Sequence, residues 1–222
     1  MKFQNIFLTI LSLCIPVTEN IMMPSGGENI NYGQWETTKN SDGVQTYVRW
    51  IEDTEGVRTR ERKGEMVIEC TVEDAIGIIT NAKSTEHWMR NVKESIDIKR
   101  VNSFEWFNYI LFDIPWPFND RDLVSRNTIK TSAEKDSALI SIISMEDFIP
   151  FRSGINRLTD YTASWSIVSI TNEKVRITFT AITSTPPMFP RWIQDPVLEH
   201  IFHKNLVNLK AFIILHKKSG RS

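Results

Sequence analysis

The sequence has few cysteines and no surplus of either charge, and both shortages limit what the protein can be. Only Cys14 and Cys70 occur in 222 residues, and Cys14 lies in an apolar N-terminal run. If that run is removed, Cys70 has no partner for an intrachain disulfide and suits a small core position. The net charge is −1 and the pI is near 6.4. Without excess Lys and Arg, no nucleic-acid partner is expected, because such binding depends on neutralising phosphates.

Recognisable enzyme motifs are also missing. The chain contains no G-x-S-x-G, no H-E-x-x-H, no cysteine pair for zinc and no glycine-rich phosphate loop. His200 and His203 are three residues apart beside Glu199, but the apolar face of their segment predicts that His200 points away and His203 only flanks that face. We therefore expect no metal, no cofactor and no catalytic residue.

No apolar run is long enough to cross a bilayer. Lys2 precedes an apolar run from Ile6 to Ile15, which is too short for a membrane span but fits a secretory signal. We expect residues 1–19 to be a signal peptide and residues 20–31 a flexible lead-in, which places the protein in the periplasm or outside the cell. A buried first helix or strand is one alternative, and a lipoprotein anchored through Cys14 is another.

The remaining chain, residues 32–218, is typical of one domain with many short strands. Alternating or strand-like runs separated by turn signals cover residues 43–52, 57–70, 95–101, 104–112, 122–131, 138–146, 157–170 and 174–183. Short connections between such runs favour antiparallel pairing. Gly64 interrupts one run, where it predicts a bulge or break.

Two segments change to a helical period. Thr71, with Asp74 three residues later, predicts the cap of one short helix. Near the C-terminus, Asp195 and Pro196 predict the cap and first position of a helix of about 20 residues, roughly 30 Å long. Its apolar face comprises Leu198, Ile201, Phe202, Leu206, Leu209, Phe212 and Ile213. Such a long one-sided helix needs a large apolar partner, which a curved sheet supplies.

Several segments in this order resemble the START family, the StAR-related lipid-transfer domains of the helix-grip superfamily. They are "RKGEMVIECTVEDAIGIIT", "HWM", "DIPWPFNDRDLVSR", "YTASWSIV" and "FPRWI", followed by the C-terminal helix. The P-W-P-x-x-x-R-D element is the most specific of them. The resemblance implies an α+β helix-grip fold, in which a curved antiparallel β-sheet wraps around the long C-terminal α-helix. It also implies a tunnel between sheet and helix that holds a lipid or sterol.

The resemblance and the strand periods together give the expected ligand-binding residues. They are Trp106, Asn108, Ile110, Trp116, Phe118, Arg121, Asn127, Phe179, Phe189, Trp192, Leu198, Phe202 and Leu206. Arg121 is expected to pin the Pro-Trp-Pro corner through the neighbouring Asp120 or Asp122. Some sterol-carrying members have an arginine six residues later, with a buried acidic partner. Here Asn127 and Asn108 occupy those places, so the charged pair is expected to be either absent or replaced by amides.

The sequence favours a non-catalytic protein that binds a hydrophobic ligand such as a lipid or sterol. Transfer of that ligand between membranes is a further possibility that it leaves open. A cyclase- or hydrolase-like enzyme of the same superfamily is the first alternative, and a secreted interaction module with a filled core is the second. Trp116, Phe118, Met188, Phe189 and Trp192 fall in two proline-rich segments. These segments are expected to form the tunnel entrance and a transient membrane contact, although they could equally close the end of the core. We expect the protein to be a monomer.

The signal peptide is directly testable. Native protein recovered from fractionated cells should begin between about Cys14 and Ser25, since the processing site follows the apolar run. N-terminal sequencing checks this, with a cytoplasmic protein from the same cells as the fractionation control. An intact Met1 on the native protein would contradict the prediction.

Overall fold

The computed structural model describes residues 30–114, 118–184 and 190–217. The proposed signal peptide with Cys14, most of the proposed lead-in, Trp116 and the segment with Met188 and Phe189 lie outside these ranges. The strands are β1 (Asn31–Tyr32), β2 (Glu36–Ser41), β3 (Val44–Glu52), β4 (Arg58–Ile68), β5 (Val92–Arg100), β6 (Glu105–Phe112), β7 (Arg121–Thr131), β8 (Ser137–Ser144), β9 (Asn156–Arg157), β10 (Tyr161–Thr171) and β11 (Lys174–Thr183). The helices are α1 (Val72–Ile79), α2 (Ala82–Trp88) and α3 (Arg191–His216).

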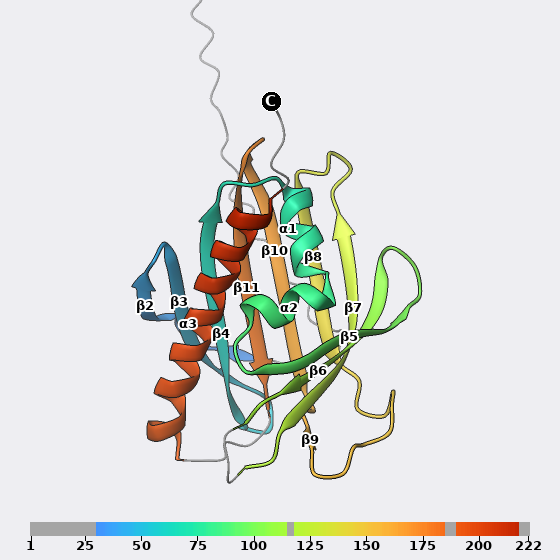
Figure 1. The fold of residues 1–222 in the computed structure, drawn as a ribbon. Helices are drawn as coiled ribbons and strands as arrows, with labels where there is room; N and C mark the ends of the chain where they lie inside the picture. The colour runs from blue at the N-terminus through green and yellow to red at the C-terminus, as the bar shows by residue number, and fades with distance from the viewer. Residues whose placement is uncertain (1–29, 115–117, 185–189, 218–222) are drawn as a thin grey trace, which may run out of the picture.

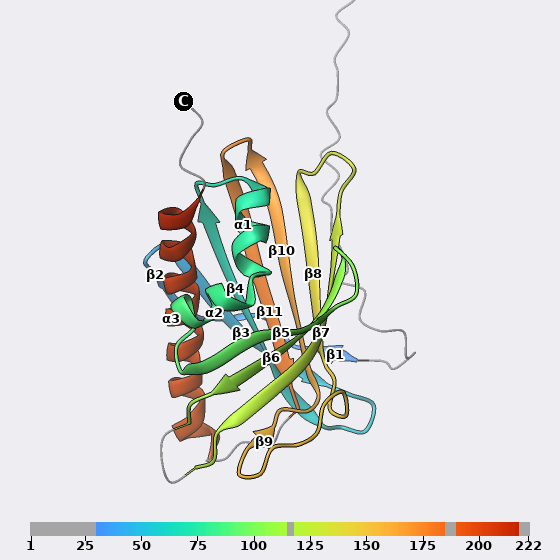
Figure 2. The same cartoon turned by 45° about the vertical axis from the view of Figure 1, so that its right-hand side comes forward.

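The strands form one curved sheet in the order β1-β3-β4-β11-β10-β8-β7-β6-β5. Every pairing is antiparallel except that of the two-residue strand β9 with β7. All three helices lie on one side of the sheet, with α3 along the β3–β4 side and α1 and α2 nearer its middle (Figures 1 and 2). The helix-grip architecture predicted from the sequence is therefore confirmed.

The short helices begin where local side chains satisfy their first backbone amides. Thr71 Oγ1 accepts from the amide of Asp74 at 3.1 Å, and Asp74 Oδ2 accepts from the amide of Thr71 at 3.2 Å, which is the predicted capping box. The sequence analysis missed α2, although Asn81 caps it by accepting from the amide of Lys83 at 3.0 Å. The omission matters because α2 covers part of the inner face of the sheet.

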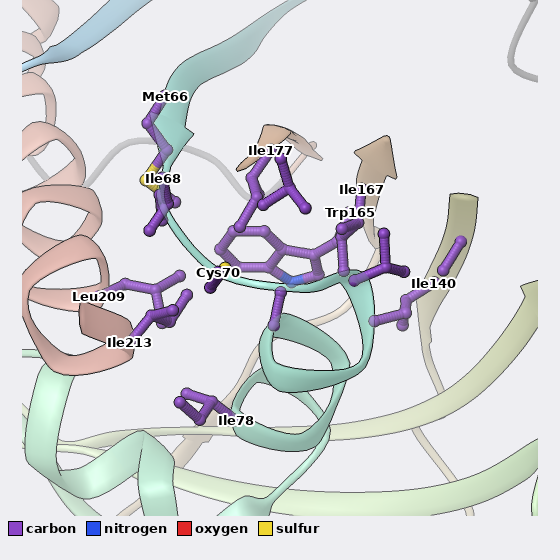
Figure 3. Close-up of a cluster of buried hydrophobic side chains, with 14 of the residues drawn as sticks. Met66, Ile68, Cys70, Ile78, Ile140, Trp165, Ile167, Ile177, Leu209 and Ile213 are labelled. Carbon is purple, nitrogen blue, oxygen red and sulfur yellow. The ribbon is translucent and has the colours of Figure 1, made fainter. Parts of the chain in front are cut away.

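The C-terminal end of α3 packs on the main hydrophobic core. Leu209 and Ile213 are fully buried, and they lie beside Met66 and Ile68 of β4. Figure 3 shows Trp165 of β10 in the middle of this group, with Ile78 of α1 on the opposite side from the sheet. Aliphatic and aromatic side chains from β4, β10 and α1 therefore fix this half of the helix.

The start of α3 differs from the prediction. The helix begins at Arg191, so Asp195 lies within it and does not cap it. Asp195 belongs to a stripe that recurs every three or four residues and faces β4: Asp195, Glu199, Phe202, Leu206, Leu209 and Ile213. The inward residues of β4 follow a matching order, with arginines first and apolar side chains later. Pairing with those arginines explains why a carboxylate is buried at position 195.

Gly64 is the point where α3 comes closest to the sheet. The pairing of β4 with both neighbours continues through Gly64 without a register shift, so the predicted bulge is wrong. A Cβ atom at this position would collide with Leu206 Cδ1 and lie 3.3 Å from Phe202 Cε1. Glycine is needed here because any side chain would collide with α3, and not because the backbone adopts an unusual conformation.

The loop before β7 is held by carboxylates that do not pair with Arg121. Asp122 and Arg157, at 1% and 2% side-chain exposure, form a two-point ion pair with contacts of 3.1 and 2.8 Å. Asp120 instead binds Lys93 at 2.9 Å. Arg121 makes no ion pair with any residue the structure describes, and its buried Nε lacks a hydrogen bond. The predicted pairing of Arg121 with Asp120 or Asp122 is therefore wrong, because Asp122 pairs with Arg157 and Asp120 with Lys93.

Substitution of Gly64 should weaken the contact between helix and sheet. Gly64→Ala should lower the free energy of unfolding by roughly 1–3 kcal/mol, because the added methyl group overpacks the Leu206 site. The matched control is Gly77→Ala in α1, where an added Cβ meets nothing within 4 Å. That change should be neutral or should stabilise the protein by up to about 1 kcal/mol. Denaturant titration measures both, and equal effects would contradict the close-approach explanation.

Removing one partner of the buried pair should be more damaging than removing Arg121. Asp122→Ala should cost about 3–5 kcal/mol, because Arg157 stays buried without its carboxylate. Arg121→Met should change stability by less than about 1 kcal/mol, since the side chain has no ion pair to lose. Midpoints of urea unfolding compare the two variants. A larger loss of unfolding free energy for Arg121→Met than for Asp122→Ala would show that Arg121 contributes more to stability than the Asp122–Arg157 pair.

Candidate functional site

A cavity of about 310 Å³ lies between the inner face of the sheet, helix α2 and the first half of α3. Strands β6 and β7 contribute every second residue to its wall, because successive side chains point to opposite faces. The apolar lining residues are Ile79, Ala82, Trp88, Met89, Trp106, Ile110, Phe112, Leu123, Ile140, Ile142, Leu158, Trp165, Phe179, Ala181, Ile182, Leu198, Ile201 and Phe202. The polar ones are Arg62, Thr80, Thr85, Asn108, Ser125, Asn127, Tyr161, Thr183 and Asn205.

Aromatic rings cross the cavity wall from α2 to α3. Trp88 meets Trp165 edge-on at 6.2 Å between ring centroids, and Trp165 stacks on Phe179 at 4.1 Å. Phe179 then stacks on Phe202 of α3 at 5.7 Å. Large rings that pack on one another hold their own positions, so they form a stable apolar surface for a ligand.

Amide side chains form a polar site on the β6–β7 side. Asn127 Nδ2 donates to Asn108 Oδ1 at 2.9 Å, and Asn108 Nδ2 donates to Asp97 Oδ1 at 3.1 Å. Asn127 Nδ2 also lies 3.3 Å from Ser125 Oγ. The two asparagines occupy adjacent strands and both line the cavity. The two amides are thus joined at the cavity wall, and their replacement of a charged pair stays a prediction.

Arg62 supplies a cation on the opposite side of the cavity. Its side chain is 12% exposed, and its Nη2 lies 3.7 Å from Asp195 Oδ1. Burial lowers the pKa of Arg62 from its ordinary value, while Asp195 and Glu199 act in the opposite direction. Arg60, which points the same way from β4, lies 3.5 Å from both Asp195 and Glu199. An arginine thus faces the cavity with a loose ion pair to Asp195.

The structure separates the expected ligand-binding residues into groups. The cavity is lined by Trp106, Asn108, Ile110, Asn127, Phe179, Leu198 and Phe202. Leu206 instead belongs to the core, while Phe118 and Arg121 do not line the cavity. Trp192 is 78% exposed and also lies outside the lining. Ligand binding by the lining residues remains a prediction.

Sequence reasoning missed several residues of the wall. Trp165, Tyr161 and Arg62 alternate with outward residues along their strands, so strand period alone could have placed them inward. Arg62 was not predicted to face the cavity because it belongs to a charged run, which normally indicates a solvent-exposed face. Trp88 and Thr85 were missed along with helix α2.

The ionisable groups near the core do not form a second site. Burial raises the pKa of the Cys70 thiol to about 11, so a structural role suits it as expected. His203 is 1% exposed, with Nε2 3.3 Å from the carbonyl oxygen of Ser41, so it is buried where the sequence suggested that it only flanks the apolar face. Burial lowers its pKa and favours the neutral imidazole.

The described residues include neither a metal-binding cluster nor a membrane-spanning helix. Within residues 30–114, 118–184 and 190–217, no group of three or more His, Cys, Asp or Glu side chains is placed to hold a metal ion. Over the same described parts of the chain, none of the helices has the length and apolar character needed to cross a membrane.

Sequence comparisons with known proteins give a distant relative. No protein-family model matches the chain. An uncharacterized Pseudomonas aeruginosa protein, PA1579, is 22% identical over 162 residues, which cover 72% of this chain and 77% of that protein. These sequence comparisons do not by themselves assign a function.

Solved structures give a stronger likeness. A STAR-related lipid transfer protein from Xanthomonas axonopodis has a TM-score of 0.69 at 25% identity, covering 81% of this chain and 98% of that one. Human STARD10 has a TM-score of 0.68 at 19% identity, with coverage of 82% and 74%. Human StAR-related lipid transfer protein 5 has a TM-score of 0.67 at 16% identity, with coverage of 81% and 86%. The chain therefore has the START helix-grip fold.

Proposed function

We propose that the protein binds one hydrophobic small molecule, lipid or sterol-like, in the cavity between the sheet and α3. The observation that carries this proposal is the cavity itself, whose wall is mostly apolar and aromatic with polar groups on two sides. A volume of about 310 Å³ falls near the lower end of the range of roughly 300–1,000 Å³ for ligand pockets. Removal of apolar ligand surface from water would supply most of the affinity.

We propose that binding involves no chemical step. Arg62 and Tyr161 are the ionisable side chains among the described lining residues, which include no carboxylate, histidine or cysteine. Burial raises the pKa of Tyr161, so its hydroxyl stays protonated and is a weak base. A cyclase or hydrolase would need a positioned acid–base pair in this space. The presence of open volume also argues against the alternative of an interaction module with a filled core.

Transfer between membranes would require contact with a bilayer, and the start of α3 is the surface that favours it. Trp192 is 78% exposed, Ile193 41% and Val197 54%. Leu198, next to Val197, lines the cavity. Tryptophan suits the membrane–water interface because one part of its ring system is apolar and the other is polar. We further propose that the mature protein is exported and acts as a monomer.

Native mass spectrometry of the purified protein tests the binding proposal. We expect one lipid-sized adduct per chain, either co-purified or acquired from a mixture of sterols and membrane lipids, and released when the protein is denatured. Ala181→Phe should abolish the adduct, because Ala181 lines the cavity and a phenyl ring would fill part of it.

The matched control is Val168→Phe, on the neighbouring strand β10 and 42% exposed on the outer side of the sheet. It should retain the adduct, while thermal unfolding confirms that both variants are folded. A wild-type protein that acquires no adduct would refute the proposal. Conversion of the bound molecule to a product would support the enzyme alternative instead.

A further inference from the structure

One row of residues crosses the cavity from a cation to an amide. The register of the sheet pairs Arg62 with Ala181, Ala181 with Ala163, Ala163 with Ile142, and Ile142 with Asn127. Arg62 and Asn127 are four strands apart, or about 19 Å along the sheet at the usual spacing of about 4.8 Å. Of the three residues between them, Ala181 and Ile142 line the cavity, and the small side chain of Ala163 lies in the same row. Arg62 and Asn127 both line the cavity, so its two ends differ in charge.

The guanidinium of Arg62 is not fully satisfied by the protein. Its Nε is buried and makes no hydrogen bond, and the same is true of Arg60 Nε and Asp195 Oδ1. The separation of 3.7 Å between Arg62 Nη2 and Asp195 Oδ1 is longer than a charge-assisted hydrogen bond, which is about 2.7–2.9 Å. A buried donor without a partner is costly, so an acceptor supplied by a ligand would be favourable here.

Among the charged residues grouped around Arg62, Arg62 is the one that lines the cavity. Arg60 and Arg191 both lower the pKa of Arg62 by repulsion, whereas Asp195 and Glu199 raise it. Glu36 acts in turn on Glu199, so three arginines and three carboxylates meet in this group. Arg60 is further engaged with the ring of Trp50, at 4.5 Å from its centroid, whereas Arg62 is the arginine that lines the cavity.

We propose that Arg62 binds an anionic head group, a carboxylate or a phosphate monoester, on a ligand with a single apolar chain or ring system. The inference rests on the proposed binding function and specifies the class of ligand. The anion would accept from the guanidinium of Arg62, while the apolar part extends along the alanine row toward Asn127 across the aromatic wall. A guanidinium suits both anions, because its planar N–H groups match two oxygens at once.

A purely structural role for Arg62 predicts that Arg60 and Arg62 have equivalent effects. If Arg62 only attached α3 to β4 through Asp195, Arg60 would be its equivalent, because Arg60 lies 3.5 Å from the same carboxylate. Arg60 does not line the cavity. Loss of Arg60 should then affect stability without affecting the choice of ligand, which makes it a matched control.

The test compares dodecanoate and dodecyl phosphate with 1-dodecanol, which has the same chain but no charge. Binding is followed by intrinsic fluorescence, since Trp88, Trp106 and Trp165 are in the cavity wall. Wild-type protein should bind at least one of the anions about tenfold or more tightly than the alcohol, as expected for a charge-assisted hydrogen bond. The stronger anion then distinguishes a carboxylate from a phosphate ligand.

Arg62→Met should remove this preference and leave the affinity for 1-dodecanol within about twofold. Arg60→Met should keep the preference. If Arg62→Met does not fold, Asp195→Asn gives the opposite test: it removes the competing carboxylate and should strengthen anion binding without changing alcohol binding. Unchanged or weaker anion binding by that variant would overturn the inference.

The outcomes also separate this inference from the proposed function. Equal wild-type affinity for anions and alcohol, or a preference that persists in Arg62→Met, would overturn the role of Arg62 while binding itself stands. Failure of wild type to bind any of the three compounds, or any lipid by native mass spectrometry, would refute the binding function.

Discussion

The packing of α3 on β4 is the contact on which the cavity depends. At Gly64 the helix approaches the strand so closely that Leu206 occupies the space of a side chain. On the C-terminal side of this point, Leu209 and Ile213 are fully buried and the helix is part of the core. On the N-terminal side, Leu198, Ile201 and Phe202 face open volume. One helix thus closes the core with one half and covers the cavity with the other.

The α3 residues that face β4 change from charged to apolar along the helix, near the close approach at Gly64. Asp195 and Glu199 face Arg60 and Arg62, whereas the later residues of the stripe face apolar side chains. Burial of separate charges is expensive, and a buried ion pair is seldom more stable than an apolar contact of the same size. The charged contact is therefore poor evidence for added stability. We interpret the charged contact instead as the polar boundary of the proposed ligand cavity, since a few oriented charges in such a cavity can select a ligand.

The sequence predicted the layers of this fold better than the details of its polar contacts. Strand and helix periods report which side chains avoid water, so the antiparallel sheet and the long helix could be predicted. Asn108 and Asn127 were also placed together, because the family resemblance aligned them on adjacent strands. The partner of Asp122 could not be predicted: Arg157 is 35 residues away, on a two-residue strand that carries no period.

Arg62 illustrates a different limit. In the sequence it belongs to a run of alternating charges, which normally indicates exposure, and only the arrival of α3 about 130 residues later buries it. The cost of that burial appears in the lowered pKa of its guanidinium. A ligand that binds the folded state offsets such a cost by mass action, in proportion to its concentration relative to its dissociation constant. A buried guanidinium nitrogen without a hydrogen bond at a cavity wall favours the proposed role in ligand binding over a role in maximum stability of the empty protein.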